Sequence, residues 1–168
     1  MVYIDFSKDF TFEELLERSL FVKFDVKEQL NNYGRIKQEG AIQFWKEQSV
    51  EAKKKSFYPD ENLDVSVETG LGIIESYYNQ HKTDEFIWTR GSFDQLAFES
   101  LYRAANNNKD AFMPFWMFRD IRTFIDLFKK STNGYGYCNI PNFDKSKVIK
   151  HDPIHDIAYD AMMMKYGE

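Results

Sequence analysis

The chain has a single cysteine, Cys138, and lacks any apolar run of about 20 residues that would cross a bilayer. One cysteine excludes an internal disulfide and is typical of a protein in a reducing, cytoplasmic setting. The beginning of the sequence also lacks the charged, apolar and small-residue regions of a signal peptide. We therefore expect a cytoplasmic protein without a membrane partner.

Positive charge is also scarce. The chain has 22 Lys and Arg residues against 27 Asp and Glu residues, and its formal net charge is −5. This balance argues against broad, non-specific binding along nucleic acid, which needs a basic surface. It leaves open an enzyme that binds one strand end through metal ions, because bound divalent cations supply local positive charge.

Apolar and aromatic residues are abundant. They make up 43% and 17% of the 168 residues, which predicts a globular chain with its own core. We find no internal repeat, low-complexity tract or linker in the sequence. Strand-like and helix-like patterns alternate along the chain, so the prediction is one α/β domain over residues 1–168.

The first part of the sequence predicts two strands around a helix. Apolar residues alternate from Val2 to Phe6, and again over residues 20–26. Between them, Thr11 is placed to cap a short helix, and Glu14 follows three residues later, as in a capping box.

The remaining elements follow from similar patterns. Val67, Leu71, Ile74 and Tyr78 share one face of a predicted helix. A later helix is expected to bury Leu96, Ala97 and Leu101. The expected helices cover residues 39–57 with a break near Ser49, residues 66–79, the stretch within 90–107, a segment from about Ile121, and the residues after Asp152 with Pro153 in first position; short strands are expected at 85–89 and just before Ile121.

Two histidines and three aspartates cluster before and within the last predicted helix, in "HDPIHDIAYD". Asp152 is the natural N-cap, with His151 just before the helix and Asp156 one turn inside it. This spacing can direct His151 and Asp156 into one cleft, as a proton-transfer group and a hard oxygen ligand for Mg²⁺ or Mn²⁺. The alternative is that Asp156 only interacts favourably with the positive end of the helix dipole.

Asp94 is a second candidate, because it follows a predicted strand and opens a helix in "RGSFDQLAF". A carboxylate at such a junction can hold a metal at the edge of a sheet, but aspartate is also common in any first helical turn. Asp120 lies between Arg119 and Arg122, which favours pairing and helix capping over phosphate binding by one of the arginines.

Several other groups suggest no chemistry. We expect the run from Met162 to Met164 to pack in a helix, and Lys53 to Lys55 to form a solvated face. His155 and Asp160 are expected to be exposed. Cys138 has no evident histidine partner, so it is not a candidate nucleophile.

The order of the pieces carries more information than each piece alone. A strand, "RGSFD" at a helix start, "FWMFRDIRT" and "HDPIHDIAYDAMMMKY" together resemble the exonuclease A (DexA) proteins of T-even-like phages. Those proteins belong to the DnaQ-like, RNase H-like superfamily with the DEDDh signature. The resemblance extends to "SLFVKFDVKEQ", "GRIKQEGAIQFWKEQSVEA" and "HKTDEFIWTRG", and so covers nearly the whole chain.

The resemblance implies an RNase H-like mixed sheet flanked by helices and a 3′-5′ exonuclease in the host cytoplasm. Members of the family cut single nucleotides from 3′ ends with two Mg²⁺ or Mn²⁺ ions held by four carboxylates, while a histidine activates water. By motif, Asp94 would be the middle carboxylate, Asp156 the last one and His151 the general base. Phe93 and Arg90 would then contact the single-stranded DNA or RNA 3′ end, although Phe93, like Trp116, is expected to pack mainly in the core.

The departure from the family is at the front. The family's first strand carries an Asp-x-Glu pair, whereas here Asp5 is followed two positions later by Ser7. The segment "VYIDFSKDFTFEEL" resembles the family's second strand, which predicts an N-terminally incomplete domain without its central strand. Asp25 or Glu28 would substitute for the lost pair only by an accident of geometry. Exposed apolar strand edges predict self-association or a partner strand.

Two alternatives to an active exonuclease follow from this departure. One is a nuclease fold without activity that serves as a binding or assembly module. The other is a reading frame whose true start lies upstream, where a segment encoding Asp-x-Glu is expected.

Overall fold

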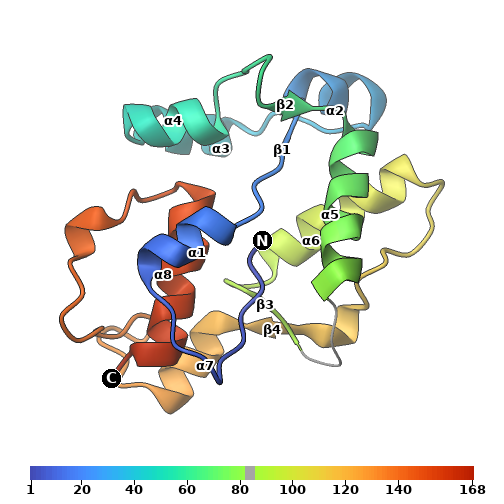
Figure 1. The fold of residues 1–168 in the computed structure, drawn as a ribbon. Coiled ribbons are helices and arrows are strands. Elements are labelled where there is room, and N and C mark those ends of the chain that lie inside the picture. Colours follow the sequence, from blue (N-terminus) through green and yellow to red (C-terminus); the bar gives the residue numbers. More distant parts are fainter. Residues whose placement is uncertain (82–85) are drawn as a thin grey trace.

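The computed structural model describes residues 1–81 and 86–168, a mixed α/β arrangement with eight helices and two small parallel sheets in that part of the chain (Figure 1). The helices are α1 (Phe12–Arg18), α2 (Val26–Asn32), α3 (Glu39–Lys46), α4 (Val50–Ser56), α5 (Val67–His81), α6 (Phe93–Ala105), α7 (Ile121–Phe128) and α8 (Pro153–Tyr166); the strands are β1 (Lys23–Phe24), β2 (Asp64–Val65), β3 (Ile87–Thr89) and β4 (Phe118–Asp120). None of these helices is long and apolar enough to span a membrane.

The strands form two separate pairs. β1 pairs with β2, with Phe24 opposite Val65, and β3 pairs with β4, with Trp88 opposite Arg119. Both pairs are parallel. Figure 1 shows them on opposite sides of the N-terminus, which lies in the middle of the molecule.

The helix starts follow the local signals. The Thr11 hydroxyl accepts from the Glu14 N–H at 3.2 Å, and the Glu14 carboxylate accepts from the Thr11 N–H at 2.7 Å, so the predicted capping box is confirmed. Ser49 caps α4 at the predicted break, and Asp152 caps α8 with Pro153 in first position. These caps form within a few residues of sequence, which is why pattern alone locates them.

The first predicted strand is wrong in the structure. Residues 2–6 have no strand conformation, and the prediction for residues 20–26 is reduced to Lys23–Phe24. Met1 and Leu20 exchange two backbone hydrogen bonds of 2.6 and 2.7 Å, and the Tyr3 N–H donates to the Tyr77 hydroxyl instead of to a strand. A strand is stabilised by backbone hydrogen bonds to a neighbouring strand along its length. This segment has such bonds only at its start, between Met1 and Leu20. Of the strand predicted at 85–89, Glu85 lies outside the described residues.

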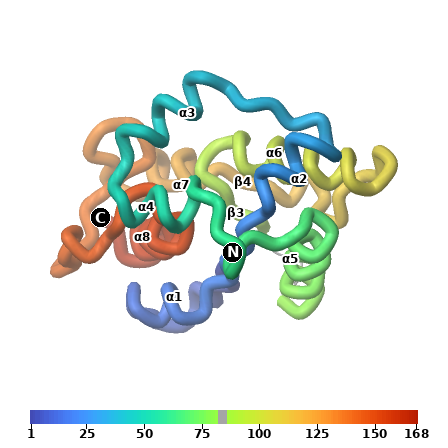
Figure 2. The backbone as a smooth tube through the Cα atoms, turned by 90° about the horizontal axis from the view of Figure 1, so that it is seen from above, coloured from blue at the N-terminus to red at the C-terminus, as the bar shows by residue number. Residues whose placement is uncertain are grey.

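The core is divided into two clusters. The larger one joins α1, α7 and α8 and includes Met162–Met164, which confirms the predicted packing of the methionine run. The smaller one joins α5 and α6 through Val67, Leu71 and Leu101. Figure 2 shows α8 beneath α4 and close to α7, on the side of the molecule away from α5.

The inward face predicted for α6 is only partly correct. Leu101 is buried, but Leu96 is 58% exposed and Ala97 is also exposed. The side of α6 that carries Ala97 faces a cavity and not the packed core that was predicted for it.

Candidate active site

A large cavity separates the two core clusters and opens to solvent, with a volume of about 1850 Å³. Its walls include residues of the N-terminal segment, α2, α3, β1, β3, α5, α6 and α8. The candidate catalytic side chains Asp94, His151 and Asp156 all line it, as do Arg90 and Asp160. Residues that are far apart in the sequence therefore line the same cavity.

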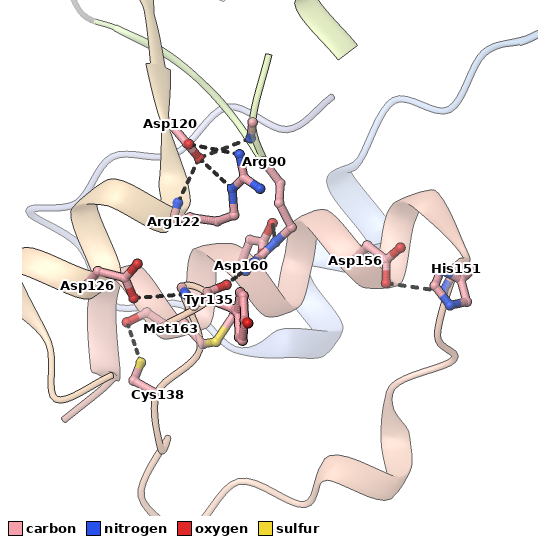
Figure 3. A network of polar contacts seen from close by, with 12 residues as sticks. Arg90, Asp120, Arg122, Asp126, Tyr135, Cys138, His151, Asp156, Asp160 and Met163 are labelled. Carbon is pink, nitrogen blue, oxygen red and sulfur yellow. Dashed lines mark hydrogen bonds and ion pairs between the residues drawn. The ribbon is translucent and has the colours of Figure 1, made fainter. Parts of the chain in front are cut away.

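Helix α8 positions two of its acidic residues on one side. Asp156 and Asp160 are four residues apart, which places them one turn from each other on the same helix face. The backbone N–H of His151 donates to Oδ1 of Asp156 at 3.3 Å (Figure 3). This contact is made by the histidine backbone, so the predicted meeting of the two side chains in one cleft stays a prediction.

His151 has an unusual backbone. Its φ angle is +64°, in the left-handed region that costs a non-glycine residue about 1 kcal/mol. Its imidazole ring packs edge-on against Phe44, with ring centroids 5.0 Å apart. Strained residues of this kind cluster at functional sites, which supports a role for His151 beyond starting the helix.

The carboxylates at the cavity are partly removed from water. Burial raises the pKa of the Asp94 carboxyl above its usual range, even though the residue as a whole is exposed. Burial also raises the pKa of Asp156, against the lowering effect of the His151 N–H. A raised pKa means that the ionised form is disfavoured, and a bound cation would reverse this preference.

Asp160 is buried, so its predicted exposure is wrong. Its carboxylate pairs with the Arg90 guanidinium, whose Nε lies 3.0 and 3.1 Å from the two oxygens (Figure 3). Arg90 also donates to the Gly136 carbonyl at 3.1 Å and lies over the Tyr137 ring at 4.4 Å. The position of α8 at the centre of the larger core explains this burial.

His155 is also less exposed than predicted. It is half-buried, its Nδ1 accepts from the Ile149 N–H at 3.2 Å, and its ring packs edge-on against Phe12. It therefore supports the loop before α8.

The aromatic candidates Phe93 and Trp116 lie on the surface. Phe93 is 79% exposed and Trp116 is 63% exposed, so the expected core packing of both is wrong. Phe93 opens α6 directly before Asp94. An exposed ring beside a cavity carboxylate is available to contact a ligand.

The acidic residues considered as substitutes for the missing pair do not line the cavity. Asp5 is held in a local turn by the Ser7 N–H and hydroxyl, at 3.0 and 2.6 Å. Asp25 caps α2, and the Glu28 carboxylate accepts from the Val67 N–H at 2.7 Å. Across residues 1–81 and 86–168, no three metal-binding side chains come close enough together to hold an ion.

Two further assignments agree with the sequence patterns. Asp120 caps α7 by accepting from the Arg122 N–H and also forms an ion pair with Arg122. Cys138 is buried, and its Sγ lies 3.8 Å from the Met163 carbonyl oxygen. The pairing of Arg90 with Asp160 was missed, although the four-residue spacing from Asp156 could have indicated that Asp160 shares its face.

Comparison with known proteins places these residues in a context. The 3′-5′ exoribonuclease Rv2179c-like domain matches residues 6–167. An exodeoxyribonuclease of Enterobacteria phage T4 is 36% identical over 175 residues, which cover 94% of this chain and 74% of the phage protein. No solved structure matches the chain.

Proposed function

Because the chain belongs to the Rv2179c-like 3′-5′ exoribonuclease domain family, we propose that it is a hydrolase that removes nucleotides from the 3′ end of single-stranded nucleic acid. The observation that carries this proposal is that Asp94, His151 and Asp156 line the same cavity. We further propose an RNase H-like sheet for the domain, in which β3 and β4 are two of the strands. The family and the phage relative carry the words ribo- and deoxyribonuclease in their names, so both sugars are candidate substrates.

His151 is the proposed proton acceptor. In the proposed reaction a water oxygen forms a bond to the terminal phosphorus and gives its proton to the imidazole. The bond from phosphorus to the 3′ oxygen of the preceding nucleotide breaks, and that oxygen takes up a proton. The products are a nucleoside 5′-monophosphate and a strand shortened by one nucleotide.

Mg²⁺ or Mn²⁺ is the proposed cofactor, with Asp94 and Asp156 as ligands. Carboxylate oxygens are the donors that these cations prefer, so the two side chains fit in type. They do not fit in number, because two carboxylates are too few for the two-ion centre of such nucleases and Asp160 is engaged with Arg90.

Phe93 is proposed to stack on a base near the strand end. Phe93→Ala should weaken binding of a single strand roughly tenfold, because stacking of a base on an aromatic ring contributes about 1–3 kcal/mol. Fluorescence anisotropy of a labelled oligonucleotide in EDTA measures this without cleavage. Leu96→Ala is the control, since Leu96 is an exposed apolar residue on the same helix. Equal affinities for wild type and Phe93→Ala would contradict the stacking role.

The hydrolase itself is tested with 5′-labelled DNA and RNA strands of one sequence in Mn²⁺. We expect a ladder of shortened products. The ladder should be lost with a chelator and in Asp94→Asn, because the asparagine side chain has the same shape but binds a metal ion much more weakly. Circular dichroism of Asp94→Asn controls for folding. Release of the 5′ label as a mononucleotide without a ladder would mean degradation from the 5′ end and would contradict the assignment. A ladder that survives in Asp94→Asn would also contradict it.

A second candidate is a nucleic-acid-binding module that does not cleave. The small number of available carboxylates at the cavity favours it. It predicts strand binding that needs no metal and does not change in Asp94→Asn, with no shortened products in Mn²⁺.

A further inference from the structure

The charged side chains at the cavity have the opposite balance to the whole chain. The chain has a formal net charge of −5, but basic residues outnumber acidic ones around the cavity. The basic lining residues are Arg35, Lys37, Arg90, Lys145 and Lys150, and the acidic ones are Asp94, Asp156 and Asp160. Arg90 and Asp160 already form an ion pair with each other. Positive charge is therefore concentrated at the cavity, although the composition as a whole is acidic.

The other basic side chains at the cavity are available to a ligand. Lys37, Lys145 and Lys150 are exposed, and Arg35 is half-buried. Within the part of the chain that the structure describes, none of these side chains forms an ion pair. The two aspartates that remain at the cavity are the proposed metal ligands. An anion at the cavity would therefore meet basic side chains that no described carboxylate occupies.

Residues 35–45 connect the two helices that carry the proposed metal ligands. At one end, the Arg35 guanidinium donates to the hydroxyl of Ser100 on α6 at 2.8 Å. At the other end, the Phe44 ring contacts the ring of His151, just before α8. Figure 2 shows this segment running from the α6 side of the molecule to the α8 side. The segment is thus held at both ends, and α3 within it buries none of its residues.

The loop before α8 carries the other two lysines. Lys145 opens a short 3-10 helix, and Lys150 directly precedes His151 in the sequence. A second cavity, of about 420 Å³, lies between residues 148–151 and the start of α4, where Glu51 also lines it. Two segments with exposed lysines therefore lie on either side of the proposed general base, and open space continues beside it.

We propose that Lys37, Lys145 and Lys150, here called the lysine surface, bind the phosphates of single-stranded nucleic acid on the 5′ side of the nucleotide that is cut. This inference rests on the proposed exonuclease, in which the uncut part of the strand leaves the cavity past His151. The lysine surface holds the strand, and it takes no part in the chemical step.

Charge and aromatic rings both favour this ligand. A single strand carries one negative charge per nucleotide, and proteins that bind it without sequence preference combine a basic groove with aromatic rings for the bases. Phe44 and Trp45 line the cavity between the lysine-bearing segments, and Phe44 is 42% exposed. The surface should therefore bind DNA and RNA strands of different sequence with similar affinity.

The salt dependence of binding tests the lysine surface. A variant with Lys37→Gln, Lys145→Gln and Lys150→Gln is titrated with a short labelled strand in EDTA, so that cleavage does not affect the result. Each phosphate contact contributes about 0.7 to the slope of log affinity against log salt concentration, so the variant should lose about 2 from this slope. The loss should be the same for strands of different sequence.

The matched control carries the same change at Lys54, Lys109 and Lys130. These lysines are exposed and are not among the described residues that line the cavity. The control changes the net charge by the same amount, so it separates the lysine surface from general electrostatic attraction. Its salt slope should stay close to that of wild type.

Strand length provides a second measurement. A dinucleotide is too short to extend from the cut nucleotide along the lysine surface, so wild type and the lysine-surface variant should bind it with similar affinity. Longer strands should bind wild type and the control more tightly than the dinucleotide does. This gain should be largely lost in the lysine-surface variant.

Three outcomes would overturn the proposal. They are equal salt slopes for the lysine-surface variant and the control, a wild-type chain that binds no strand in EDTA, and an acidic peptide that binds as tightly as the strand. Cleavage in Mn²⁺ is measured separately. A chain that binds strands through these lysines but gives no ladder would contradict the hydrolase and keep the lysine surface. A ladder with an unchanged salt slope in the lysine-surface variant would do the reverse.

Discussion

Replacing Arg90 with methionine should lower the free energy of unfolding by about 3 kcal/mol, because it leaves the buried Asp160 carboxylate without its partner. The Asp160 side chain is only 7% exposed and that of Arg90 is 24% exposed, so water replaces the lost guanidinium poorly. Urea denaturation at pH 7 measures the change. Methionine keeps much of the arginine volume, which limits the loss to the charge and its hydrogen bonds.

The pH dependence of the Arg90→Met variant distinguishes a lost ion pair from lost packing. Burial raises the pKa of Asp160, and Arg90 opposes this rise. Without Arg90 the pKa of Asp160 rises further, so the folded state binds a proton more readily than the unfolded chain, whose Asp pKa is about 3.9. The stability deficit of the variant should therefore be small near pH 4 and grow as pH rises through the folded-state pKa.

The control for this prediction is Arg122→Met. Arg122 pairs with Asp120, but the two side chains are 47% and 31% exposed, so its loss should cost less than about 1 kcal/mol. An Arg90→Met deficit that is equally small, or that does not change with pH, would show that the buried ion pair does not stabilise the fold.

Replacing His151 with asparagine should slow strand shortening by about 10²–10⁴-fold, the usual contribution of a positioned general base. Asparagine tolerates the left-handed backbone that His151 adopts at φ +64°, so the N–H donated to Asp156 is kept and only the imidazole is lost. The rate is measured in Mn²⁺ with the 5′-labelled strand. Thermal unfolding of the variant should stay close to wild type, because the packing that it loses is the edge-on contact with the partly exposed Phe44 ring.

His155→Asn is the matched control for the imidazole. His155 accepts from the Ile149 N–H and packs on Phe12, so its loss should lower the unfolding temperature while the shortening rate of the folded protein stays within a few-fold of wild type. A His151→Asn variant that cleaves at the wild-type rate would remove the imidazole from the mechanism and leave His151 with the helix-starting role of its backbone.

The sequence by itself determined the features that depend on neighbouring residues. The Thr11–Glu14 capping box, the Ser49 break and the Asp152–Pro153 start of α8 form where the patterns predict them. Each uses hydrogen bonds between groups at most three residues apart, so no distant partner can change the result. The motif order was also sufficient to identify the exonuclease family, because short motifs keep their order along the chain.

Only the tertiary structure decided what depends on distant partners. Arg90 and Asp160 are 70 residues apart, and their pairing buries a carboxylate that the local sequence predicts to be exposed. Residues 2–6 alternate as a strand does, but in the folded chain they have only the pairing of Met1 with Leu20 and so remain irregular. A strand and a buried charge both need a partner that only the fold brings close. Strand β3 finds such a partner in β4, and its residues also line the open cavity.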